Sequence, residues 1–135
     1  MKNFVDNKLI NRLLAKDIYI RGINCRSFIL GSLFQSMNVQ FSYVDANDKY
    51  VGMKLWGNEC VSPSTVSENE DSFVFVTVEG ANSLNQILAE LDSKKIGHYV
   101  LSSDESVSLL EYIPDDLFYK NLVELALLIK DKRSF

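Results

Sequence analysis

The order of apolar and polar positions along the chain predicts alternating strands and helices. Apolar runs and strict alternation predict strands at 18–20, 39–45, 53–55, 73–78 and 98–101. Apolar positions at helical spacing predict helices at 4–16, 25–36, 83–95 and 114–133. Alternation of this kind predicts an α/β fold, with a doubly wound, mainly parallel sheet of about five strands and helices on both faces.

The strand Phe73–Val78 is continuously apolar and rich in β-branched and aromatic residues, which indicates burial on both faces. The helix after it is expected to start at a capping box of Ser83 and Gln86 and to be capped at its end by Gly97. Gly31, a weak helix former, is expected to let the helix 25–36 approach the sheet closely.

The C-terminal helix, 114–133, is apolar nearly all round. Between Leu117 and Ile129 only Lys120, Asn121 and Glu124 interrupt the larger apolar side chains. Since a surface helix normally shows a single apolar stripe, this helix needs burial on two sides. We expect one face to dock on the sheet and the other on a second subunit of a homo-oligomer, through residues such as Leu125 and Leu128. Burial of the whole helix in the core is the alternative.

Length and charge narrow the class of protein. The 135 residues, 47% of them hydrophobic, suffice for one domain with its own core, 1–135. A net charge of −4, with no stripe of lysine or arginine, argues against nucleic-acid binding. No uncharged apolar segment approaches the ~20 residues of a membrane span. The first residues lack the apolar core of a signal peptide, so we expect a cytoplasmic protein.

Candidate catalytic chemistry is sparse. Cys25 and Cys60 lie in no metal-like spacing and are interpreted as reduced thiols, so no metal ligand is assigned. A nucleophilic Cys25 at a helix start remains an alternative to which no base can be assigned. His98, the single histidine, is expected to be structural. Trp56 either covers the edge of the core or stacks on a base or sugar. No catalytic residue is therefore assigned.

The segment around Gly22 is the strongest candidate for a binding site. A buried strand ends at Gly22 and a helix follows at once, as at the nucleotide site of doubly wound folds. Asn24 and Ser27 stand where the later glycines of a G-x-G-x-x-G fingerprint are expected. Asp45 ends the next strand, near the ~20-residue spacing of a ribose-binding carboxylate.

Glu79 and Gly80 end the strand 73–78 and are expected to line the same cleft. The candidate binding residues are Gly22, Ile23, Asn24, Asp45, Glu79 and Gly80. The alternatives left open are an ordinary strand-to-helix turn at Gly22, an Asx turn at Asp45 and ordinary helix capping after Glu79.

The chain contains a set of short motifs whose order along the sequence resembles that of a known protein family. The motifs are Ile18-Tyr19-Ile20-Arg21-Gly22, Tyr43-Val44-Asp45-Ala46-Asn47, Gly57, Val61-Ser62-Pro63, Val74–Val78, and Leu88-Ala89-Glu90-Leu91 through Gly97-His98-Tyr99. Over about 16–101 the chain resembles the Rossmann-like nucleotide- or sugar-nucleotide-binding domains of bacterial polysaccharide biosynthesis proteins. These domains occur beside sugar acyltransferase and sugar methyltransferase modules.

The resemblance implies a Rossmann-like fold with a nucleotide or nucleotide-sugar cleft at the carboxyl ends of the strands. Gly22 would be the turn glycine, and Asp45 would face the ribose or sugar. Since Asn24 and Ser27 carry side chains where the fingerprint has glycines, we expect Arg21 or Arg26 to bind the phosphate directly through the guanidinium group.

The function predicted on this basis is a non-catalytic nucleotide or nucleotide-sugar binding module of polysaccharide biosynthesis. The ligand is left open between NAD(P) and a nucleotide sugar. One alternative is a fragment or subunit of a sugar-modifying oxidoreductase, methyltransferase or acyltransferase. Another is a structural interaction module with a vestigial cleft, in which the helix 114–133 matters most.

Overall fold

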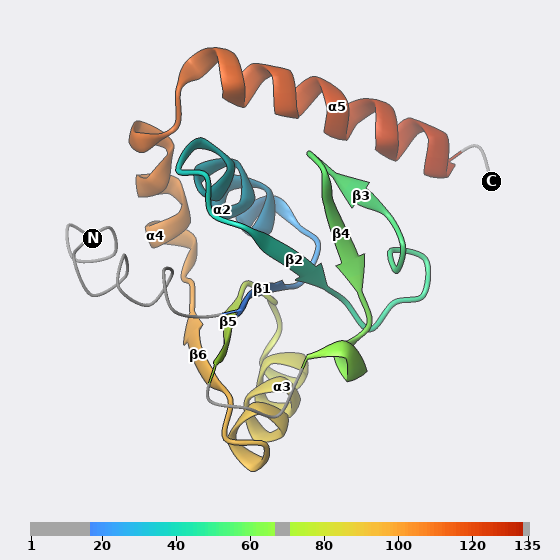
Figure 1. Ribbon diagram of the computed structural model, residues 1–135, viewed down its shortest axis with the longest axis vertical. Helices are drawn as coiled ribbons and strands as arrows, with labels where there is room; N and C mark the ends of the chain where they lie inside the picture. Colours follow the sequence, from blue (N-terminus) through green and yellow to red (C-terminus); the bar gives the residue numbers. More distant parts are fainter. Residues whose placement is uncertain (1–16, 67–70, 134–135) are drawn as a thin grey trace.

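One mostly parallel sheet forms the centre of the structure, a computed structural model that describes residues 17–66 and 71–133 (Figure 1). The strands are β1 (Asp17–Arg21), β2 (Phe41–Val44), β3 (Lys54–Leu55), β4 (Asn58–Val61), β5 (Ser72–Val76) and β6 (Gly97–Val100). The helices are α2 (Cys25–Ser36), α3 (Ala81–Ser93), α4 (Ser103–Ser108) and α5 (Asp115–Arg133), with 3₁₀ turns η1 (Pro63–Thr65) and η2 (Leu109–Tyr112). The prediction of an α/β fold is confirmed.

The strand order is β3-β4-β2-β1-β5-β6, and only the short β3 pairs antiparallel with its neighbour. Ile20 on β1 lies between Tyr43 on β2 and Phe75 on β5, at the centre of the sheet. All five residues of β5 are buried, which confirms the prediction for this strand. Strands β2 and β4, which follow β1 in the sequence, lie on one side of β1 in the sheet, and the later strands β5 and β6 lie on its other side. The order therefore reverses between β1 and β5.

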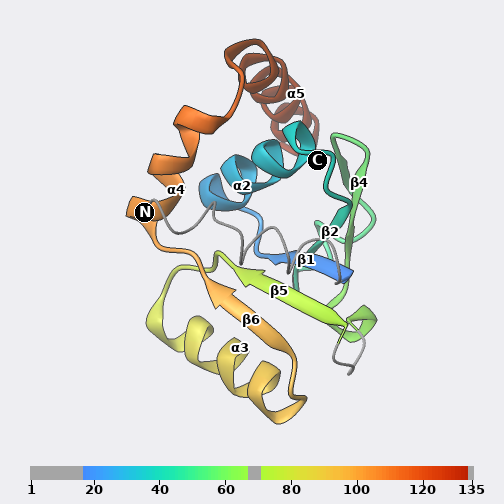
Figure 2. The same cartoon turned by 60° about the vertical axis from the view of Figure 1, so that its left-hand side comes forward.

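Helices cover both faces of the sheet, as predicted (Figure 2). On one face lie α2, α4 and α5; on the other lies α3. The larger core cluster joins the first face to its helices and includes Ile20, Phe34 and Phe75, none of which is exposed. The smaller cluster lies under α3 and contains Val74 and Ile87. Side chains that alternate along each strand thus supply two separate cores.

Gly31 brings α2 close to the sheet, as predicted. A Cβ atom at this position would overlap the Tyr43 hydroxyl and lie 3.1 Å from the Trp56 ring. Trp56 is only 8% exposed, and its ring centroid lies 5.2 Å from that of Phe28. Trp56 therefore covers the core edge, which is the first of the two alternatives considered for it.

Helix α5 docks on α2 through a buried polar contact. Asn121 is fully buried, and its Nδ2 donates to Ser32 Oγ at 3.1 Å and to Gln35 Oε1 at 2.7 Å. Leu125 lies on the same side, is half-buried and packs against the core, and its role in an interface stays a prediction. The side chain of Leu128 lies outside the described part of the chain. Tyr119 and Val123 are 64% and 60% exposed, so the alternative of burying the whole helix in the core is wrong.

Two predicted helix caps differ from the structure. Helix α3 begins at Ala81 after Gly80, whose φ is +93°, so Ser83 lies within the first turn and does not cap it. The helix ends at Ser93 with Lys94 as its C-cap, and Gly97 is instead the first residue of β6. A Cβ atom on Gly97 would lie 3.0 Å from the Phe73 ring, which explains the glycine at this strand position.

The predicted helix 4–16 lies outside the described residues. Among residues 17–66 and 71–133, no helix combines the length and the apolar character that crossing a bilayer requires.

Candidate functional site

The six predicted binding residues lie along the carboxyl edge of the sheet. Gly22, Ile23 and Asn24 follow β1, Asp45 follows β2, and Glu79 and Gly80 follow β5. Because β2, β1 and β5 are parallel neighbours, their carboxyl ends lie side by side. The structure therefore brings the predicted residues to one edge, centred on the point where the strand order reverses.

At this point Gly22 meets the end of β5. Gly22 has a φ of +112°, and its N–H donates to Val44 O at 2.8 Å. A Cβ atom on Gly22 would lie 2.8 Å from Thr77 Oγ1 and 3.1 Å from Val78 Cγ2. Glycine is required here by the backbone angle and by these side chains. Thr77 and Val78 occupy the space beside Gly22.

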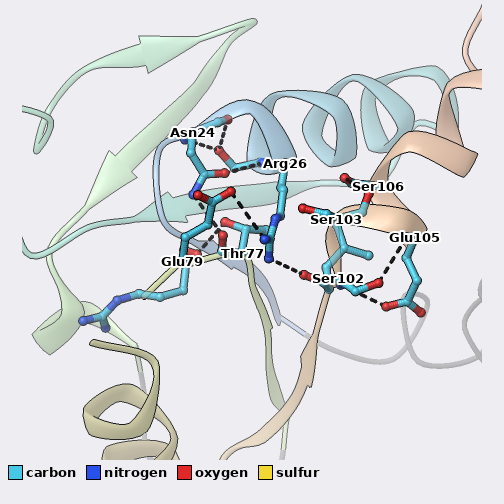
Figure 3. Close-up of polar contacts among 11 residues, drawn as sticks. Asn24, Arg26, Thr77, Glu79, Ser102, Ser103, Glu105 and Ser106 are labelled. Atoms are coloured by element: carbon cyan, nitrogen blue, oxygen red, sulfur yellow. Dashed lines mark hydrogen bonds and ion pairs between the residues drawn. The ribbon is translucent and has the colours of Figure 1, made fainter. Parts of the chain in front are cut away.

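Asn24 and Ser27, which have the spacing from Gly22 expected for the later glycines of a dinucleotide fingerprint, form the capping box of α2 (Figure 3). Asn24 Oδ1 accepts from Ser27 N at 3.1 Å, and Ser27 Oγ accepts from Asn24 N at 2.9 Å. Asn24 Nδ2 also donates to Thr77 O at 2.9 Å. The same side chain thus satisfies the helix start and links β1 to β5.

Arg26 reaches from the first turn of α2 to the ends of two strands (Figure 3). Its Nη1 donates to Leu101 O at 3.0 Å, and its Nη2 lies 3.4 Å from Glu79 Oε1. The Arg26 side chain is 19% exposed, whereas that of Glu79 is 67% exposed. The buried Nε has no hydrogen-bond partner among the described residues, so the five donors of the guanidinium are not all used.

Arg21, the other predicted phosphate-binding arginine, faces away from this edge. Its Nη1 lies 3.7 Å from Glu90 Oε2 on α3, and its side chain is 12% exposed. Of the two arginines, Arg26 alone makes its hydrogen bond and ion pair with groups at the carboxyl edge.

Asp45 forms an Asx turn. Its Oδ1 accepts from Asn47 N at 2.8 Å, and its own N–H donates to Val61 O at 3.2 Å. This is the local alternative to ribose binding considered from the sequence. One carboxylate oxygen of Asp45 therefore stabilises the turn after β2.

Helices α2 and α3 both begin at the carboxyl edge, because each follows a parallel strand. Helix α3 starts after Gly80 without a side-chain cap. The N–H groups and dipoles of helix starts favour anions. The Glu79 side chain lies at this edge, because Glu79 precedes α3, and it pairs with Arg26 on α2.

A second capping box stands beside the site, where β6 passes into α4 (Figure 3). Glu105 Oε1 accepts from Ser102 N at 3.0 Å, and Tyr99 Oη donates to Glu105 Oε2. Burial and this hydrogen bond raise the pKa of Tyr99 to about 12. Burial opposes ionisation of Glu105, but hydrogen bonds from Tyr99 and Ser102 outweigh it and lower the pKa of Glu105.

The two cysteines differ in access. Cys60 is buried, and burial together with Asp45 and Glu59 raises its pKa to about 11, which leaves it protonated at neutral pH. Cys25 is exposed at the first position of α2. His98, at the other end of β6, contacts Ile96 O and Asp92. In residues 17–66 and 71–133, no three His, Cys, Asp or Glu side chains are grouped as a metal site requires.

The described residues form two hollows on other faces or edges of the sheet. One is lined by Arg21, Pro63 and Ile87 on the α3 face, and the other lies at the amino ends of β1 and β2, beside Tyr19 and Ser42. Neither hollow includes any of the six predicted binding residues.

Sequence reasoning overlooked Thr77. Its hydroxyl donates to Arg21 O at 2.8 Å and fills the space beside Gly22. The available signal was one polar residue at the end of an otherwise apolar run.

Comparisons of the chain with protein-family models, with curated proteins and with solved structures each found no match.

Proposed function

We propose that the chain is a Rossmann-like, non-catalytic module that binds a nucleotide or nucleotide sugar at the carboxyl edge between β1 and β5. The observation that carries the proposal is Arg26, whose guanidinium reaches the point of strand reversal and pairs there with the exposed Glu79 carboxylate. In open α/β sheets, ligands bind outside the carboxyl ends of the strands at this point. The resemblance to polysaccharide biosynthesis domains supports the nucleotide-sugar class and a cytoplasmic setting.

The phosphate would lie over Arg26 rather than over the Gly22 backbone. Thr77 and Val78 fill the space beside Gly22, and Asn24 carries a side chain there. A guanidinium binds phosphate through paired hydrogen bonds. An incoming phosphate would displace the exposed Glu79 carboxylate from Arg26 and take its place near the starts of α2 and α3.

Two substitutions with opposite expected effects test this mechanism. Arg26→Gln removes the phosphate-binding charge, so affinity should fall at least tenfold. Glu79→Gln removes the carboxylate that competes with phosphate, so affinity should rise several-fold. Affinities are measured by titration calorimetry and thermal shift with NAD, NADP and a panel of nucleoside-diphosphate sugars. Arg21→Gln is the matched control, because Arg21 pairs with Glu90 on the other face.

Absence of a thermal shift with every one of these ligands at millimolar concentration would overturn the proposal. A loss of stability alone does not explain opposite changes in affinity for Arg26→Gln and Glu79→Gln. An equal loss of binding in all three variants would place the ligand elsewhere and would contradict the role of Arg26.

A structural interaction module with a vestigial cleft is the second candidate. It is favoured by the internal bonding of the edge, where Asn24 bonds to Thr77 and the Asp45 carboxylate stabilises its own turn. Under this alternative the wild-type protein binds no nucleotide, and the exposed side of α5 carries the function. The further alternative, a part of a sugar-modifying enzyme, stays a prediction that assays on a longer protein would test.

A further inference from the structure

The outer side of α5 carries a continuous apolar surface in the described chain. The exposed residues Tyr119, Leu122, Val123, Ala126 and Leu127, here termed the outer stripe, follow the spacing i, i+3, i+4, i+7 and i+8. Their exposed fractions reach 64% at Tyr119 and 60% at Val123. Such spacing places all five on one side of the helix.

The inner side of α5 is already occupied, so the outer stripe is a second and separate surface. Phe118 packs edge to face on Phe28 with centroids 5.4 Å apart, and Asn121 bonds to Ser32 and Gln35 on α2. These contacts hold α5 along the outside of α2, at the boundary of the molecule (Figure 1). The outer stripe therefore points away from the α2 core.

The charged residues at the two ends of α5 indicate which kind of partner would cover the outer stripe. Asp115 and Asp116 lie in the first turn. In the sequence, Lys130 and Arg133 continue the helical spacing of the outer stripe beyond Leu127. A second α5 laid antiparallel, with Val123 at the centre, brings each acidic start beside the basic end of the other helix. The same register pairs Tyr119 with Leu127 and sets Asp116 opposite Lys130, so these apolar and charged positions agree on one alignment, whereas Asp115 stands opposite Asp131.

We propose that a second copy of this chain covers the outer stripe, in a two-fold symmetric dimer with antiparallel α5 helices centred on Val123. Two-fold dimers with self-complementary surfaces are the commonest oligomers. A single helix pair buries less than a standard interface, so the expected dissociation constant is micromolar. This proposal rests on α5 alone and stands or falls independently of nucleotide binding.

Sedimentation velocity from low to several hundred micromolar protein tests the dimer. Wild type should change from monomer to dimer over this range, and Val123→Asp should remain monomeric with an unchanged circular dichroism spectrum. Val107→Asp is the matched control, because Val107 is 62% exposed on α4 and lies outside the outer stripe. A wild type that stays monomeric throughout, or equal disruption by both variants, would overturn the proposal.

Disulfide trapping tests the alignment in a Cys25→Ser background, which removes the exposed native thiol. In the antiparallel dimer, Val123→Cys should crosslink to itself, while Tyr119→Cys should crosslink to Leu127→Cys on mixing and not to itself. Efficient self-crosslinking of Tyr119→Cys would indicate parallel helices and contradict the proposal.

Charge reversal tests the end contacts. A protein carrying Asp116→Lys should dimerise more weakly alone than wild type, and so should one carrying Lys130→Asp. Mixed together, the two proteins should form a heterodimer, because each reversed end then meets an opposite charge. Failure of the mixture to associate, with both helices intact by circular dichroism, would contradict the proposed charge pairing.

Discussion

The Tyr43 hydroxyl lies against the backbone of Gly31, where a Cβ atom would overlap it. Tyr43 is fully buried on β2, and its hydroxyl has no hydrogen-bond partner among the described residues. The absent side chain of Gly31 thus creates the room that lets a tyrosine fill the space between α2 and the sheet.

Gly31→Ala should destabilise the protein although alanine is the better helix former. The gain in helix propensity is about 1 kcal/mol, whereas overpacking a closed core costs about 1–3 kcal/mol. Tyr43→Phe removes an unsatisfied buried hydroxyl and should be neutral or slightly stabilising. The double variant should recover most of the loss, with a coupling of at least about 0.5 kcal/mol in urea unfolding. Purely additive effects would contradict this packing.

Asn121→Ala should weaken the docking of α5. The variant loses the hydrogen bonds to Ser32 and Gln35 in a buried setting, at an expected cost of about 1–3 kcal/mol. The comparison is Asn85→Ala, an exposed position within α3 that should change stability by less than about 0.5 kcal/mol. Urea unfolding followed by the fluorescence of Trp56, the single tryptophan, measures both. Equal effects would show that the buried amide adds nothing.

The pattern of apolar and polar residues predicted those helices and strands in which apolar side chains recur at a regular spacing. The predicted helix 25–36 matches α2 at both ends, although the capping box of Asn24 and Ser27 that marks its start was interpreted from the sequence as a departure from the glycine fingerprint. Strand β4 was missed, since Cys60 is its one buried residue and its pairing with β2 defines it as a strand. Helix α4 was missed as well, because its residues are mostly polar and the Ser102 capping box stabilises it.

The edge that carries the candidate site could be predicted, but its bonding could not. Alternation of strands and helices places Gly22, Asp45 and Glu79 at the carboxyl ends of parallel strands. The direction of Arg26 depends on the carbonyl of Leu101, 75 positions later in the chain. Contacts of this range follow from the packed sheet and leave no local trace in the sequence.

Thiol labelling should separate the two cysteines. Cys25 is exposed at the start of α2 and should react with a maleimide in the folded protein. Cys60 is buried, and its pKa is raised to about 11, so it should react only after unfolding. Mass spectrometry of the native protein should show one label, and Cys25→Ser should show none. Rapid labelling of both thiols in the native state would contradict the burial of β4.

The hydrogen bond from Tyr99 to Glu105 should stabilise the protein within a defined pH window. The pKa of Glu105 is lowered from 4.5 in the folded state, so its contribution is present above that value and is lost as pH falls through the folded pKa. The pKa of Tyr99 is raised from 10.0 to about 12, so its contribution is present below 10.0 and is lost as pH rises towards 12.

Tyr99→Phe should therefore cost stability most between these limits and least at either extreme. Urea unfolding across a pH series, for wild type and variant, measures the difference in unfolding free energy. Tyr112→Phe is the control, because Tyr112 is an exposed residue whose pKa is raised by its hydrogen bond to Glu111, and such a surface contact should add no measurable stability. If the difference in unfolding free energy between wild type and Tyr99→Phe stays constant over the whole pH range, the Tyr99 hydroxyl stabilises the protein without its hydrogen bond to Glu105.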